Sequence, residues 1–167
     1  MSVFRTAEES GMNRILTVLV SALCLAGCFS SAPEAPVAWI IDADTDLVVS
    51  AVSVAAPYDG LRLVVLRPDG SVAFDGHNSF SSRPGALIRA AVRVDFAAPP
   101  LFVRRLALDC TQKGTRKAVV DLAFGGTAEA PLLRASGSAD ASDGNYTRAF
   151  SEAFVKAREG LRQSAGN

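Results

Sequence analysis

Asp42, Asp44 and Asp46 form a D-x-D-x-D pattern, a spacing of carboxylates that could bind a metal ion. The same pattern opens an EF-hand calcium loop, which also requires glycine at its sixth position and glutamate at its twelfth. Counted from Asp42, those positions hold Leu47 and Ser53. We therefore expect no calcium site, and interpret the aspartates as a polar turn between two strands.

His77 is the only histidine, and it has no neighbouring cysteine with which to build a zinc site. A serine nucleophile would need His77 as its base, but the chain has no G-x-S-x-G motif. It also lacks the G-x-x-x-x-G-K-[ST] motif of a P-loop, and no pair of carboxylates stands out for acid–base catalysis. The sequence predicts no catalytic residue, no cofactor, no metal site and no enzyme activity.

Residues 15–27 are an uncharged apolar segment that follows Arg14. Thirteen residues are too few for a membrane-spanning helix, which needs about 20. A basic residue, a short apolar run and small residues at its end are typical of a secretory signal peptide. Because Glu8 and Glu9 do not suit such a signal, we expect Met12 to be the true start.

The signal ends in the tetrapeptide L-A-G-C of the bacterial lipobox, formed by Leu25, Ala26, Gly27 and Cys28. In proteins with this motif the cysteine thiol receives a diacylglycerol, cleavage leaves the cysteine as the first residue, and its amine is usually acylated with a fatty acid such as palmitate. The alternative is an ordinary secretory signal followed by a chance cysteine. We interpret Cys28 as the site of lipid attachment.

Lipid attachment at Cys28 has consequences for location and for the other cysteines. Two or three acyl chains anchor a protein durably, since each buried CH₂ adds about 0.8 kcal/mol. Under the enteric sorting rule, an aspartate after the lipidated cysteine retains a lipoprotein at the inner membrane. This chain has Phe29 at that position, which favours the outer membrane. Cleavage would remove Cys24, so Cys110 would have no disulfide partner, and we expect it to be a small buried residue.

The composition excludes some partners. The chain has 17 basic and 17 acidic residues, so it has no excess of positive charge with which to bind nucleic acid. Its length fits one domain. We expect a signal peptide over 1–27, a lipidated N-terminus and tether over 28–36, and a single domain over 37–167.

Apolar runs bounded by turn residues predict the strands of this domain. The run at 47–54 is apolar on both faces, as in a central, covered strand. A helix is predicted to begin at Arg83-Pro84-Gly85, to have apolar residues as far as Val94, and to end before Pro99. The expected strands are 37–43, 47–54, 61–67, 71–75, 101–109, 116–124 and 131–139.

The C-terminal segment 146–163 predicts an amphipathic helix. Its apolar stripe should pack on the sheet, with Phe150 and Phe154 in the core; the stripe is Ala149, Phe150, Ala153, Phe154, Ala157 and Leu161. The order of elements predicts an α+β fold with a mostly antiparallel sheet and two helices packed on one face.

Two stretches resemble the paraquat-inducible lipoprotein family, the auxiliary lipoprotein component of ABC-type transporters. In the first stretch the family's elements match Tyr58-Asp59, Leu63 to Arg67, Phe80, and Pro84 with Leu87. In the second, the family's A-F-x-x-A pattern matches Ala149 to Ala157, and Trp39 to Asp42 match the family's first strand. Family members commonly have a tryptophan near the position of Phe80, where this chain has Asn-Ser-Phe, so the family's partner surface cannot be mapped residue by residue.

The resemblance implies an accessory subunit of an ABC-type transport system. Such lipoproteins occur with an ATPase, a permease and a periplasmic protein with an MCE domain, in systems that move phospholipids or other hydrophobic molecules between the two membranes. The lipoprotein is expected to dock the periplasmic component at a membrane, and to form a homo-oligomer or act singly. An independent lipid-binding carrier and an outer-membrane assembly lipoprotein remain the alternatives.

Overall fold

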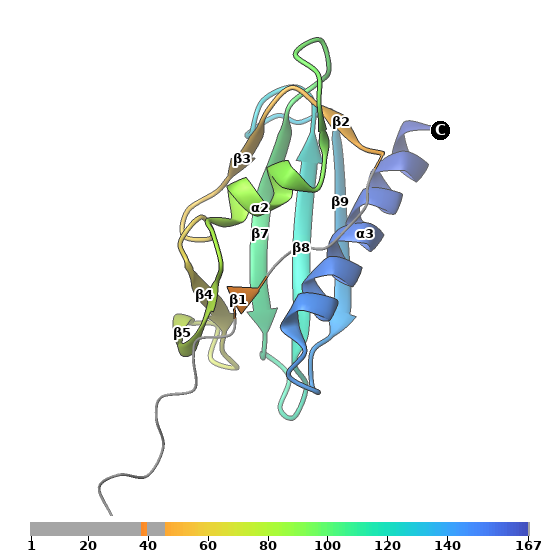
Figure 1. Ribbon diagram of the computed structural model, residues 1–167. Coiled ribbons are helices and arrows are strands. Elements are labelled where there is room, and N and C mark those ends of the chain that lie inside the picture. Colours follow the sequence, from red (N-terminus) through yellow and green to blue (C-terminus); the bar gives the residue numbers. More distant parts are fainter. Residues whose placement is uncertain (1–37, 40–45, 167) are drawn as a thin grey trace, which may run out of the picture. The chain divides into compact units, whose positions relative to one another are not determined.

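The computed structural model of the chain describes residues 38–39 and 46–166, which belong to one compact unit. Five strands come before a short helix, four strands follow it, and a long helix comes last among the described elements (Figure 1). The strands are β1 (Ala38–Trp39), β2 (Val48–Val49), β3 (Val52–Val54), β4 (Arg62–Leu66), β5 (Val72–Phe80), β6 (Arg93–Val94), β7 (Leu101–Asp109), β8 (Lys117–Phe124) and β9 (Leu133–Asp140), and the helices are α2 (Pro84–Ala90) and α3 (Tyr146–Ala165).

Within the described residues, the main sheet has the strand order β1-β5-β4-β7-β8-β9. The long ladders, β4 with β5, β7 with β8, and β8 with β9, are antiparallel. The parallel pairs are shorter: β3 and β4 lie beside the same edge of β7, where β3 pairs with residues 101–103 and β4 with residues 108–109. The predicted α+β class is confirmed, and the sheet is mixed.

Both helices cover the same face of the sheet, as the sequence predicts (Figure 1). Leu87 and Ile88 of α2 belong to the same buried cluster as the apolar stripe of α3. The rings of Phe80 and Phe150 meet edge to face with centroids 5.7 Å apart, and this contact joins the end of β5 to α3. The predicted core positions Phe150 and Phe154 are both buried, the latter completely.

The longest helix lies very close to the last strand of the sheet. A β-carbon added at Gly137 of β9 would overlap the backbone carbonyl of Ala153 and the backbone N–H of Ala157 in α3. On the helix side, a β-carbon at Gly160 would crowd the side chain of Ala135. Glycine in a strand usually weakens the strand, but it permits close approach of another backbone. Gly137 and Gly160 therefore set the distance between α3 and β9.

Two predicted elements are wrong in their bounds. The predicted helix through Val94 ends at Ala90, because Arg93 and Val94 pair as β6 with β2 in a second small sheet. The predicted single strand 47–54 is two short strands, β2 and β3. Neither is a covered central strand, since β2 pairs with β6 in the small sheet and Val52 and Val54 of β3 are only half-buried. Backbone pairing across the chain overrides the local apolar pattern at both places.

Other elements follow the sequence more closely. The predicted strands 61–67, 101–109, 116–124 and 131–139 correspond to β4, β7, β8 and β9, and the C-terminal helix to α3. The strand predicted at 71–75 extends to Phe80 through an irregular stretch in which the carboxylate of Asp75 accepts hydrogen bonds from the backbone N–H groups of His77 and Asn78. Of the strand predicted at 37–43, only Ala38 and Trp39 lie within the described residues.

We expect Gly137→Ala to destabilise the domain by about 3 kcal/mol or more, because the new methyl group would meet backbone atoms that cannot move without shifting α3. Urea unfolding followed by circular dichroism measures this loss. Gly76→Ala is the matched control, since a β-carbon at Gly76 would have no atom within 4 Å. Equal unfolding midpoints for the two variants would contradict the close packing of α3 on β9.

We expect Phe154→Ala to lower the free energy of unfolding by about 3–5 kcal/mol, the usual cost of removing a buried aromatic ring. The same measurement on Phe96→Ala provides the control, because Phe96 is 87% exposed and its loss should change stability by no more than about 0.5 kcal/mol. If both variants unfold alike, the apolar stripe of α3 is not the core of this fold.

Candidate functional site

The residues predicted to carry the lipid anchor, Leu25, Ala26, Gly27 and Cys28, lie outside the described residues. The same is true of Asp42 and Asp44 from the D-x-D-x-D pattern. Over residues 38–39 and 46–166, neither helix is long and apolar enough to cross a membrane. The anchor therefore stays a prediction from the sequence.

The third aspartate of the pattern takes part in ion pairs. The carboxylate of Asp46 binds the guanidinium groups of Arg158 and Arg162 on α3, with 3.2 Å between Arg158 Nη1 and Asp46 Oδ1. In the part of the chain that the structure describes, no cluster of histidine, cysteine and carboxylate side chains could hold a metal ion. In this structure Asp46 connects the segment before β2 to α3.

His77 and Cys110 show no arrangement for nucleophilic chemistry. His77 is exposed on the irregular part of β5. Cys110 follows β7 and is half-buried against the core, and burial raises the pKa of its thiol. A thiol with a raised pKa is mostly protonated and is a poor nucleophile.

A cavity of about 360 Å³ lies on the face of β7, β8 and β9 opposite α3. Gly137 faces α3, so Ser136 beside it points to the other face, because successive side chains of a strand alternate. Strand register then places Arg105, Asp121 and Ser136 in one row across the three strands. Arg134, two residues before Ser136, shares their face.

Arg104 joins this cavity through an irregularity in β7. The pairing of β7 with β8 shifts between Val103 and Arg105, so Arg104 is an extra residue in the ladder. Such a β-bulge redirects a side chain that regular alternation would send to the other face. Arg104 and Arg105 thus both line the cavity, and Tyr58 lines it from the loop between β3 and β4.

The polar contacts of the cavity involve only some of its charged atoms. Arg105 Nε donates to Asp121 Oδ2 over 2.7 Å, and Arg134 Nη2 donates to the backbone carbonyl of Glu129 over 3.2 Å. Within the described residues, Arg104 has no ion pair or side-chain hydrogen bond, and Asp121 Oδ1 is buried without a partner. The lining contains three arginines and one aspartate, so the cavity has an excess of positive charge.

A second feature is the loop between β6 and β7, which carries Phe96. The segment 93–103 runs beside 48–54, but Asp95 N–H bonds to Val49 and Ser50 N–H bonds to Pro99. The neighbouring residues Val49 and Ser50 thus bond to Asp95 and Pro99, which are four positions apart. Residues 96–98 therefore loop out of the pairing. The side chain of Asp95 accepts a hydrogen bond from the backbone N–H of Ala97, and its carbonyl accepts one from that of Ala98, at 2.9 Å each. These contacts brace the loop.

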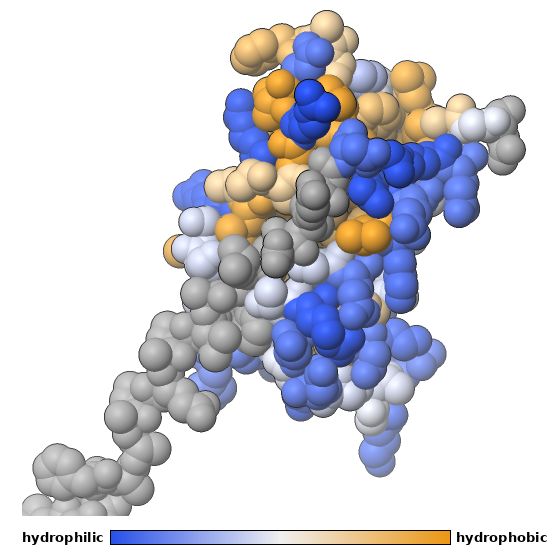
Figure 2. Space-filling view, turned by 45° about the vertical axis from the view of Figure 1, so that its right-hand side comes forward, coloured by the Kyte–Doolittle hydropathy of each residue, from blue (hydrophilic) through white to orange (hydrophobic). Residues whose placement is uncertain are grey.

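The braced loop exposes apolar side chains at one end of the sheet. Phe96 is 87% exposed, and Leu132, in the loop between β8 and β9, is 75% exposed. The two loops lie at the same end, because Gly125 N–H bonds to the carbonyl of Pro100 and Leu132 N–H to that of Gly125. Figure 2 shows hydrophobic residues gathered toward the upper end of the molecule, where the green loop stands in Figure 1. We call Phe96 and Leu132 the apolar tip.

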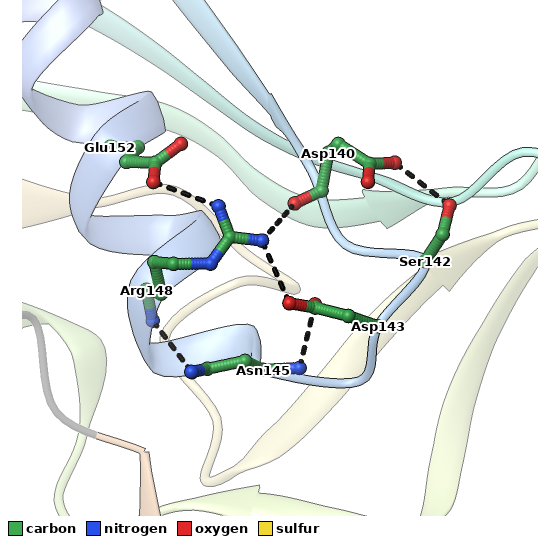
Figure 3. Close-up of polar contacts among 6 residues, drawn as sticks. All are labelled: Asp140, Ser142, Asp143, Asn145, Arg148 and Glu152. Carbon is green, nitrogen blue, oxygen red and sulfur yellow. Dashed lines mark hydrogen bonds and ion pairs between the residues drawn. The ribbon is translucent and has the colours of Figure 1, made fainter.

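A dense group of polar contacts lies at the start of α3 (Figure 3). Asn145 caps the helix through its side-chain oxygen, which accepts a hydrogen bond from Arg148 N–H. The Arg148 guanidinium binds the carboxylates of Asp143 and Glu152 at 3.0 and 2.8 Å. The backbone N–H of Asn145 and the Arg148 guanidinium hold the pKa of Asp143 below its usual value. These groups are exposed and satisfy one another, so the group stabilises the helix start.

The fold is similar to those of two solved structures. Protein XCC0632 from Xanthomonas campestris, assigned to the family DUF330, is 15% identical to this chain and matches with a TM-score of 0.51 over 81% of this chain and 94% of that one. A second crystal structure, of an uncharacterized protein, is 12% identical and matches with a TM-score of 0.50 over 80% of this chain and 96% of that one. No model of a known protein family and no curated protein matches the sequence. At these identities, the likeness shows a shared fold.

Neither the cavity nor the apolar tip was among the sequence-predicted sites. The adjacent arginines at 104 and 105 in an otherwise apolar strand were a signal for the cavity, since a charged pair interrupts the pattern of a buried strand. The signal for the tip was Phe96, a large apolar residue that lies shortly before Pro99 and Pro100 and outside the apolar stripe of the predicted helix.

Proposed function

We propose that this protein is a membrane-anchored accessory lipoprotein of an ABC-type, MCE-linked transport system, in which it docks the periplasmic MCE-domain component. It is not an enzyme in this proposal. The lipobox at Cys28 and the resemblance to paraquat-inducible lipoproteins support it. The likeness of the fold to a DUF330 protein is compatible with it. The anchor would hold the domain at the periplasmic side of the outer membrane, as Phe29 favours.

The apolar tip is the observation that carries the docking role. Large apolar residues that are almost fully exposed mark interaction sites when they gather together. Aromatic residues are common among the few that supply most of the binding energy at protein interfaces. Phe96 stands on a loop that backbone and Asp95 contacts hold in place, so little conformational freedom would be lost when a partner covers it. An MCE-domain partner would bind here through an apolar pocket.

The carrier alternative has less support from the geometry. A carrier must enclose the acyl chains of its lipid in an apolar cavity. The cavity on the sheet is lined by three arginines, an aspartate and a serine beside Tyr58, Leu122 and Ala135, and the charged groups would have to lose their hydration against hydrocarbon. Its polar lining suits a charged group.

Capture of partners from lightly cross-linked envelopes tests the proposal. We expect the wild-type protein to co-purify with the MCE-domain protein and its permease, and Phe96→Ser to reduce this recovery tenfold or more, since an aromatic anchor residue contributes about 2 kcal/mol. Val72→Ser is the control: Val72 is 51% exposed, and it pairs with Leu66 near the opposite end of β7. Recovery of outer-membrane assembly machinery alone would overturn the docking proposal, and so would recovery of the protein alone with lipid in a defined ratio.

The anchor is tested separately with Cys28→Ser. This variant cannot form the thioether to diacylglycerol, so we expect no incorporation of labelled fatty acid and accumulation of uncleaved precursor. Cys110→Ser serves as the control and should be labelled like the wild type, because Cys110 lies in the folded domain. Normal cleavage of Cys28→Ser, together with unchanged recovery of the MCE-domain protein, would refute the need for a lipid anchor.

A further inference from the structure

The arginine-lined cavity on the sheet has features of a binding site that the proposed docking role does not use. It lies on the face of β7, β8 and β9 opposite α3, whereas the apolar tip lies in the loops beyond one end of these strands. Its volume of about 360 Å³ is enough for a small polar molecule. Its residues come from three strands and one loop, so the chain brings them together only when it folds.

The charges of the cavity favour an anion. Asp121 neutralises one of the three arginines through the contact with Arg105, while Arg104 and Arg134 have no carboxylate partner within the described residues. Both of these arginines line the same cavity, so a bound anion would be attracted by two positive charges. Tyr58 adds a phenolic O–H that can donate a further hydrogen bond.

The number of donors distinguishes a phosphate from a carboxylate. A single arginine can bind both oxygens of a carboxylate side by side. A phosphate has further oxygens, which can accept hydrogen bonds from a second arginine and from a hydroxyl group. Arg104, Arg134 and Tyr58 approach the cavity from different elements and therefore suit the tetrahedral group better.

Asp121 favours a positively charged group on the ligand, in addition to the anion that the arginines favour. Its Oδ1 atom is buried and accepts no hydrogen bond from the described residues. Its other oxygen, Oδ2, is held by Arg105, so Asp121 acts on a ligand through its negative charge and not through a free hydrogen-bonding atom. A simple anion would be repelled by this carboxylate. A ligand that carries an ammonium group close to its phosphate is attracted by both parts of the cavity.

We propose that the cavity binds a phosphate ester with an adjacent amine, of which phosphoethanolamine is the simplest example. The phosphate lies between Arg104 and Arg134, and the ammonium group lies beside the Asp121 carboxylate. The same chemistry occurs in a soluble phosphate ester and in the head group of a phospholipid. The inference does not depend on the proposed docking function, because it concerns binding by the isolated chain, and Arg104 and Asp121, whose variants test it, are not part of the apolar tip.

Calorimetric titration of the full-length chain in a phosphate-free maltoside detergent tests this site. The probes are phosphoethanolamine and a short-chain phosphatidylethanolamine, with inorganic phosphate, ethanolamine and acetate as comparisons. We expect saturable binding of at least one of the two esters, tighter than that of any comparison compound. Tighter binding of the lipid would identify a head group as the source, and tighter binding of the soluble ester would identify a free metabolite. Either result supports the site.

Three variants show whether the cavity is responsible. Arg104→Gln should weaken binding of the preferred ester about tenfold or more, because it removes a charged hydrogen-bond donor from an exposed position at which folding is unaffected. Asp121→Asn should abolish the preference for the ester over inorganic phosphate. Arg67→Gln, at an exposed position in the turn between β4 and β5, is the matched control and should bind like the wild type.

Two outcomes would overturn the proposal. One is the absence of saturable binding at millimolar concentrations of both esters. The other is an equal loss of affinity in Arg104→Gln and Arg67→Gln, which would mean that the ligand responds only to the general charge of the surface. Failure to capture a protein partner through the apolar tip would leave these binding constants unchanged, so the two proposals can fail independently.

Discussion

Gly137 leaves no room for a side chain between β9 and α3, and the arrangement of the domain depends on this close approach. With the helix backbone directly against the strand, Phe150 meets Phe80 of β5, and Phe154 belongs to the same buried cluster as Leu87 and Ile88 of α2. A wider separation would leave a gap beneath the stripe of α3, and an unfilled gap in a core is costly. The alanines of the stripe serve the same purpose, because small residues allow the helix to lie flat on the sheet.

Both helices of the described residues lie on one face of the sheet (Figure 1), so in this part of the chain no helix covers the other face of β7, β8 and β9. That face has polar residues at alternate positions, and the cavity forms where a β-bulge adds Arg104 to the row of Arg105, Asp121 and Ser136. The apolar tip also arises from an irregularity. The segment 93–103 is longer than the segment 48–54 with which it pairs, and its residues 96–98 loop out. Regular pairing would have removed both features. Irregular pairing is therefore what gives this small sheet its two candidate contact sites.

Sequence reasoning was most successful where one local pattern and one tertiary role coincide. The stripe of α3 predicts both a helix and its buried face, and the strands from Leu101 onward have clear turn residues between them. It failed at the helix end, where Arg93 and Val94 pair with β2, because a two-residue ladder leaves no periodic signal. It could not find Gly137, since a glycine in a strand can equally mark a weak point or a close contact. The cavity depends on a bulge and on cross-strand register, which are properties of the pairing and not of any single segment.

The two candidate sites differ in the kind of interaction that they can make. The apolar tip can gain free energy only by removing Phe96 and Leu132 from water, an effect that does not depend on charge. The cavity can gain it only through charged hydrogen bonds, which salt screens. The whole chain carries equal numbers of basic and acidic residues, so neither site is helped by a general electrostatic attraction. Selectivity must therefore come from local geometry: from the braced loop that holds Phe96 at the tip, and from the spacing of Arg104, Arg134 and Asp121 in the cavity.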